Sequence, residues 1–130
     1  MTFPAALAST RSTIFASEEE TIRNCLLKMK KNGSRAILLT RKKGERELIT
    51  GIFTESDLLK KIQFLEHPLN WNRPIEALMR TDFKTLPVEK LGEAAAYMTK
   101  YDIKSVPIVS GKGPVFRENI WGMVHGSDIV

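Results

Sequence analysis

The chain has 130 residues, of which 42% are hydrophobic and 27% are charged. This length suffices for a hydrophobic core, and the composition is that of a soluble globular protein, which excludes a disordered chain. The net charge is +5, but the basic residues form short clusters without interleaved aromatic residues. This pattern predicts solvated faces and no nucleic-acid surface.

Cys25 is the single cysteine, so a disulfide framework is excluded and a cytoplasmic setting is expected. Residues 1–9 contain a short Ala-Ala-Leu-Ala run. They have no basic region before it and too few apolar residues for a signal peptide. No stretch approaches the roughly 18 apolar residues of a membrane span, so no direct membrane insertion is expected.

In chain order, the first half predicts a β-α-β-β-α unit. Residues 13–15 have the character of a short strand, and Ser17-Glu-Glu-Glu20 has the pattern of a capping box for the helix that follows. That helix carries apolar residues at i, i+3, i+4 and i+7 and is expected to stop at Gly33. The remaining elements are strands at 35–40 and 48–53, a turn at 42–45 between them, and a helix over 57–65.

Residues 66–74, EHPLNWNRP, contain two prolines and two asparagines, which predict a linker that Trp71 packs down. A second unit follows, with a helical turn at 75–79 and an extended segment at 82–86. Its helix carries a stripe of Leu91, Ala94, Ala95 and Met98. Two strands, at 106–109 and 120–124, flank a longer loop at 110–114.

The turn from strand into helix between Thr54 and Ser56 is a candidate anion site. A helix N-terminus offers unpaired N–H groups and partial positive charge, and Thr54 and Asp57 add a hydroxyl and a carboxylate at that end. The same Thr-x-x-Asp pattern is also an approximate capping box, in which both residues only start the helix. From the motif alone, both interpretations stay open.

The chain contains this motif twice. GMVHGSD at 122–128 repeats GIFTESD at 51–57 at a spacing of 71 residues. Upstream, the helix positions Ile22, Cys25 and Met29 match Leu91, Ala94 and Met98 at a spacing of 69, so the second copy has a loop two residues longer. Such self-similarity predicts one supersecondary unit used twice, with each copy burying its open face on the other.

The motifs GIFTESDLL and GMVHGSDIV, with KSVPIV as the second strand of the later copy, resemble the tandem cystathionine beta-synthase (CBS) domain pair, also called a Bateman module. The resemblance implies an α/β (α+β) fold in which two βαββα repeats pack in pseudo-two-fold fashion into one compact module. It divides the chain into an N-terminal segment (1–11), repeat 1 (12–65), a linker (66–74) and repeat 2 (75–130). The final helix of repeat 2 stops two residues after Asp128, which suggests an excised piece of a longer protein or a helix replaced by another segment.

In the resembled family an adenine nucleotide lies in the cleft between the repeats. The implied ligand is AMP, ADP, ATP or S-adenosylmethionine, as a regulatory ligand and not as a required cofactor. The motif aspartate takes the ribose hydroxyls, and the Thr or Ser contacts phosphate. The first site would use Thr54, Asp57, Ser34, Arg35, Ala36, Ile37 and the backbone near Ala16 and Ser17. The second, weaker site would use Asp128, His125, Lys104, Ser105, Val106, Pro107 and Thr85.

Two departures from the family pattern bear on these sites. His125 stands where the first repeat has Thr54, so the second site lacks its phosphate hydroxyl and is either empty or uses a pH-sensitive imidazole. Leu38 stands at the position of Pro107, a milder change. Arg35 and Lys104 occupy matched positions and either neutralise phosphates or are plain surface charges.

The sequence offers little for catalysis. It has no metal-ligand spacing of histidines or cysteines and no nucleophile beside a base, so no enzyme is predicted. Two functions remain open. One is a sensor module that passes the binding of an adenosine-containing ligand to an unknown effector. The other is an interaction module of the same fold with empty clefts, and in both cases a homodimer is expected.

Overall fold

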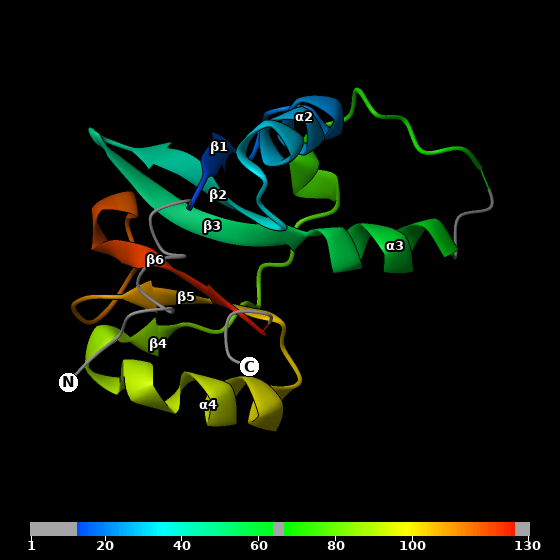
Figure 1. Cartoon of the computed structure of the whole chain (residues 1–130). Coiled ribbons are helices and arrows are strands. Elements are labelled where there is room, and N and C mark those ends of the chain that lie inside the picture. The colour runs from blue at the N-terminus through cyan, green and yellow to red at the C-terminus, as the bar shows by residue number, and fades with distance from the viewer. Residues whose placement is uncertain (1–12, 64–66, 127–130) are drawn as a thin grey trace. The chain divides into compact units, whose positions relative to one another are not determined.

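The computed structural model of the protein describes residues 13–63 and 67–126 (Figure 1). The chain divides into two units, Ile14–Asp82 and a second that begins at Phe83. Among the described residues, each unit holds one three-stranded sheet with helices. The α/β fold class predicted from the sequence is confirmed. No helix in this part of the chain has both the length and the apolar character needed to cross a membrane.

The sheet of the first unit has the order β1-β2-β3, with β1 parallel to β2 and β2 antiparallel to β3 (Figure 1). β1 starts two residues later than predicted. β2 and β3 are longer than predicted, and Gly44, with φ of 69°, stands in the turn between them. The elements are β1 (Phe15–Ser17), α2 (Ile22–Asn32), β2 (Ala36–Lys43), β3 (Arg46–Thr54) and α3 (Glu55–Gln63).

Helix α2 is capped by Thr21 and not by Ser17, so the predicted capping box at Ser17–Glu20 is wrong. The Thr21 hydroxyl accepts from the backbone N–H of Asn24 at 3.1 Å. Ser17 instead makes a turn with Glu19, because the N–H of Glu18 donates to Thr40 O at 2.9 Å and keeps this segment on the sheet. The helix ends as predicted at Gly33, whose φ of 62° suits a residue without Cβ.

The core of the first unit lies between α2 and one face of its sheet. Strand residues alternate between faces, so Ile37, Leu39 and Phe53 point to this core while Thr54 belongs to the opposite face. The core thus packs against the face of the sheet opposite to Thr54. The buried members are Ile14, Ile22, Cys25, Met29, Ile37, Leu39, Phe53 and Ile75.

The predicted linker is bonded to the first unit. Carbonyls of Trp71 and Arg73 each accept, at 2.9 Å, from the first N–H groups of α2, which have no partner inside the helix. Trp71 packs against the core, as predicted. The predicted helical turn is present as a 3-10 turn, η1 (Ile75–Ala77), and Ile75 is fully buried in the core of the first unit.

The second unit repeats this plan with local changes. The predicted stripe is confirmed at Leu91, Ala94 and Met98, which are buried, whereas Ala95 is exposed. The extended segment at 82–86 shortens to a two-residue strand. The elements are β4 (Leu86–Pro87), η2 (Val88–Glu93), α4 (Ala94–Tyr101), β5 (Ser105–Val109), η3 (Arg117–Asn119) and β6 (Ile120–His125), and the sheet order is β4-β5-β6. The final helix expected after Asp128 lies outside the described residues.

The two sheets match down to their irregularities. A register shift occurs between Leu39 and Thr40 in the first sheet and between Ile108 and Val109 in the second. These positions are 69 residues apart, which is the spacing found in the helices. The internal repeat seen in the sequence is therefore a repeat of backbone structure.

Candidate functional site

At the strand-to-helix junction of the first unit, Thr54 and Asp57 are linked by two reciprocal hydrogen bonds. The N–H of Asp57 donates to the Thr54 hydroxyl at 3.1 Å, and the N–H of Thr54 donates to Asp57 Oδ2 at 3.0 Å. This is the geometry of a capping box, so the capping interpretation of the motif is correct for this structure. Both side chains stand at the N-terminus of α3, where the helix dipole favours an anion.

Asp57 has a further partner that the sequence did not suggest. Arg80 Nε lies 3.1 Å from Asp57 Oδ1 and 3.2 Å from Oδ2. The aspartate side chain is only 14% exposed, whereas that of Arg80 is 38% exposed. The carboxylate is thus shared between the helix cap and a guanidinium from the segment after η1.

Gly51, the first residue of the motif, makes room for that segment. Arg80 and Ile52 exchange backbone hydrogen bonds of 2.8 and 3.0 Å at the outer edge of β3. A Cβ on Gly51 would lie 2.6 Å from Met79 Sδ and 3.0 Å from Arg80 O. A glycine is therefore required for the chain to pass this closely.

Of the other first-site residues, the structure brings three to the junction. Ala36 pairs with Thr54 across the strands, and Arg35 O accepts from Glu55 N at 3.1 Å. The Ser34 hydroxyl donates to Ala36 O at 2.7 Å. Arg35 is exposed and therefore free to reach an anion by its side chain.

The remaining first-site residues lie apart from the junction. Ile37 is fully buried and faces the helical core. Ala16 and Ser17 pair with Leu39 and Thr40, on the other side of the central strand. Three to four residues of strand, roughly 10–13 Å, separate that pairing from Ala36. Contact of these residues with a ligand stays a prediction.

In the second unit, His125 stands at the position that matches Thr54 and is hydrogen-bonded to Ser105. His125 Nδ1 lies 2.7 Å from the Ser105 hydroxyl, and the two residues face each other across β5 and β6. Asp128 lies outside the described residues. Lys104 is exposed, and its carbonyl accepts from Gly126 N at 2.8 Å, while Val106 and Pro107 are buried. The predicted second site thus contains a new side-chain contact where the first has a threonine.

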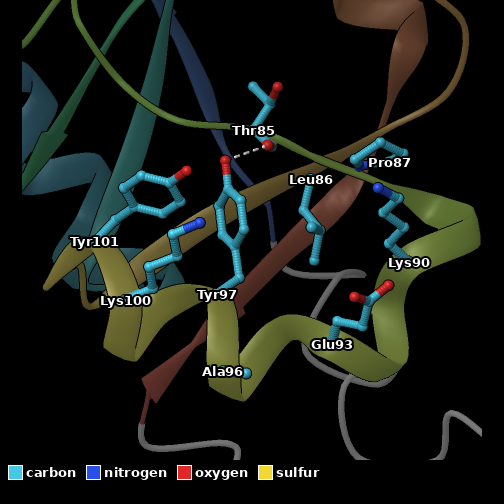
Figure 2. A pocket seen from close by; sticks show the side chains of 9 residues that line it. All are labelled: Thr85, Leu86, Pro87, Lys90, Glu93, Ala96, Tyr97, Lys100 and Tyr101. Carbon is cyan, nitrogen blue, oxygen red and sulfur yellow. Dashed lines mark hydrogen bonds between the residues drawn. The ribbon is translucent and has the colours of Figure 1, made fainter.

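Thr85 borders a cavity of about 420 Å³ beside α4 (Figure 2). Its carbonyl accepts from the Tyr97 hydroxyl at 2.9 Å, and Figure 2 shows the Tyr97 ring rising from α4 toward it. Burial and the neighbouring Tyr101 raise the pKa of Tyr97. The cavity carries charges of both signs, and its lining comprises Thr85, Leu86, Pro87, Lys90, Glu93, Ala96, Tyr97, Lys100 and Tyr101.

A second cavity, of about 350 Å³, lies on the other side of α4 and includes Lys104 and Gly126 in its lining. In the described part of the chain, no group of three or more His, Cys, Asp or Glu side chains is placed to hold a metal ion. Thr54, Asp57 and Arg80 form a connected polar cluster at the end of β3.

Duplicated three-stranded sheets with matched register shifts define a module of two related α/β repeats. The family model described as CBS domain matches residues 6–63 and 75–130. The chain therefore belongs to the CBS domain family and is a CBS pair. The family resemblance carried by the two sequence motifs is confirmed.

One curated relative is an uncharacterized protein of Methanocaldococcus jannaschii, MJ1404. It is 28% identical over 133 residues, which cover 93% of this chain and 30% of that protein. The chain thus spans less than a third of the length of the relative it matches.

Solved structures share the fold. The CBS domain pair of protein MJ0100, in complex with 5′-methylthioadenosine and S-adenosyl-L-methionine, matches with a TM-score of 0.72 and 21% identity over 98% of this chain and 94% of that one. The CBS domain protein PAE2072 from Pyrobaculum aerophilum, complexed with AMP, matches with a TM-score of 0.70 and 21% identity. The match covers 90% of this chain and 82% of that one. A hexameric CBS-CP12 protein from bloom-forming cyanobacteria matches with a TM-score of 0.72 and 19% identity. The match covers 98% of this chain and 69% of that one. At these identities the likeness shows the fold alone.

Proposed function

We propose that this CBS pair is a regulatory module of the cytoplasm. It binds an adenosine-containing ligand at the Thr54–Asp57 junction and passes the binding state to an attached or partner effector. The observation that carries this proposal is the placement of a hydroxyl, a carboxylate and a helix N-terminus together at the end of β3. The proposal retains repeat 1 at 12–65, the linker at 66–74 and repeat 2 at 75–130.

The chemistry of the junction suits a nucleotide. The Thr54 hydroxyl accepts from Asp57 N and still has a proton to donate to a phosphate oxygen. The Asp57 carboxylate can accept from two ribose hydroxyls through charge-assisted hydrogen bonds. The exposed Arg35 at the start of β2 adds a positive charge for a phosphate. MJ0100 and PAE2072, which share the fold, were solved with adenosine-containing ligands.

The proposal assigns the second junction a weaker role. With His125 bonded to Ser105, no hydroxyl stands at the place that Thr54 holds in the first repeat. We therefore propose one functional ligand site in the first repeat, and no catalytic role for either junction.

A second function is favoured by one observation. Leu59 and Ile62 on α3 are 63% and 44% exposed. Among the described apolar residues of α3, only Leu58 packs against the core. Exposed apolar side chains on adjacent turns form a patch that suits a protein contact, which supports a homodimeric interaction module without a ligand.

The test is isothermal titration of AMP, ADP, ATP and S-adenosylmethionine into the natural chain, Asp57→Ala and Glu55→Ala. Glu55 is an exposed acid in the same helical turn, so its replacement controls for the loss of negative charge. Asp57→Ala should weaken binding by about tenfold or more, and Glu55→Ala should not. Circular dichroism and thermal melts check that both variants fold.

Unchanged affinity in Asp57→Ala would show that the site assignment is wrong. No heat with any of the four ligands would favour the interaction module. In that case light scattering should give a dimer for the natural chain and a monomer for Leu59→Glu.

A further inference from the structure

Arg80 is placed by the backbone and not by chance contact of a flexible side chain. The segment before it is held by Leu78 N and Met79 N, which donate to Ile75 O at 2.9 and 3.0 Å. Arg80 itself then joins the free edge of β3 through two backbone hydrogen bonds to Ile52. From this anchored position its Nε spans both oxygens of Asp57.

The contact with Arg80 occupies the Asp57 carboxylate, which is the group that would bind the ribose hydroxyls. Asp57 Oδ2 already accepts from Thr54 N, and Arg80 Nε lies within 3.2 Å of both oxygens. With the aspartate side chain only 14% exposed, two ribose hydroxyls have little access to it. The Arg80 side chain is more exposed and can move into solvent without any change in its backbone hydrogen bonds.

We propose that Arg80 is an internal competitor for the ligand at Asp57, so that the segment between the repeats sets the affinity of the first site. This inference rests on the proposed function, because it concerns the same carboxylate. A ligand must displace the guanidinium, and a partner that lifts residues 79–80 from the edge of β3 would raise the affinity. The position of the segment that connects the repeats would thereby control the affinity of the first site for its ligand.

The experiment compares the natural chain with Arg80→Gln and Arg73→Gln. Both substitutions remove one positive charge from the same segment, but Arg73 is exposed and its backbone, not its side chain, caps α2. The ligands are AMP and 5′-methylthioadenosine, which share the ribose hydroxyls while the second carries no phosphate. Isothermal titration measures each affinity, and thermal melts verify folding.

If Arg80 competes with the ligand, Arg80→Gln should raise the affinity for both ligands by a similar factor, about fivefold. This factor is expected for the release of an ion pair worth roughly 1 kcal/mol. Arg73→Gln should not tighten either ligand. Combining Arg80→Gln with Asp57→Asn should abolish the gain. Binding that appears only in Arg80→Gln would also support competition.

Three results would overturn the inference. If Arg80→Gln weakens AMP but leaves 5′-methylthioadenosine unchanged, Arg80 is a phosphate contact and not a competitor. If the natural chain binds, Asp57→Ala loses binding and Arg80→Gln has no effect, the proposed function stands and the competition fails. If neither the natural chain nor Arg80→Gln binds either ligand, both proposals fail together.

Discussion

The junctions at the ends of β3 and β6 share a backbone but not a chemistry. In the first repeat Glu55 N donates to Arg35 O, and in the second Gly126 N donates to Lys104 O. On this common frame, Thr54 faces Ala36 in one repeat and His125 faces Ser105 in the other. Duplication has thus preserved the strand geometry, while the side chains that face each other across the strands differ.

The helices behind the two sheets differ in a related way. α2 is α-helical from its first turn, because Thr21 caps it and linker carbonyls satisfy its first N–H groups. The matching segment of the second repeat begins as the 3-10 helix η2, and neither η2 nor α4 has a side-chain cap. The first repeat therefore has the better-satisfied helix start, which suits the unit proposed to hold the ligand site.

The largest expected effect tests the close packing that is seen at Gly51. Gly51→Ala should destabilise the protein by about 2–3 kcal/mol, because its Cβ would overlap the side chain of Met79, which packs against the core, and would press on the backbone of Arg80. Urea unfolding measures the change.

The control for this substitution is Gly92→Ala in the second repeat, where nothing lies within 4 Å of the added Cβ. That variant should be neutral or slightly more stable. Equal stability of Gly51→Ala and the natural chain would mean that residues 79–80 do not dock closely on β3.

The next effect is a pH dependence of stability that only the first repeat should contribute. The core position that Cys25 holds in the first repeat is occupied by Ala94 in the second, which cannot titrate. Burial raises the pKa of the Cys25 thiol from an ordinary 9.0 to about 11. Above pH 9 the unfolded chain loses this proton while the folded chain keeps it. The stability that the thiol contributes below pH 9 is therefore lost as the pH rises toward 11, by about 2 kcal/mol at pH 10.5.

The measurement is urea unfolding at pH 8 and at pH 10.5 for the natural chain and for Cys25→Ala. Tyrosines and lysines titrate in the same range, so the difference between the two proteins isolates the thiol. A fall in stability that is the same in both proteins would show that Cys25 does not carry the effect.

Much of this arrangement could be predicted from the sequence, because local patterns carry it. The spacing of Ile22, Cys25 and Met29, the stop at Gly33 and the duplicated motif each follow from residues close in the chain. Arg80 could not be predicted, because it stands 23 residues from Asp57 in a segment without periodicity, and only the edge pairing with Ile52 brings it near. The Ser105–His125 hydrogen bond likewise depends on strand register, although both residues were candidates for the site.

The smallest expected effect concerns the helix ends, which match at a spacing of 69 residues. Gly33 ends α2 with φ of 62°, and Asp102 ends α4 in the same left-handed conformation with φ of 51°. A residue with a Cβ is strained there, so Asp102→Gly should stabilise the protein by about 0.5–1 kcal/mol. Gly33→Ala should lower stability by a similar amount, and Asp102→Ala, which keeps the Cβ, should give no gain. Urea unfolding of the three variants measures these differences. A loss of stability in Asp102→Gly would show that the carboxylate, and not the backbone conformation, determines how α4 ends.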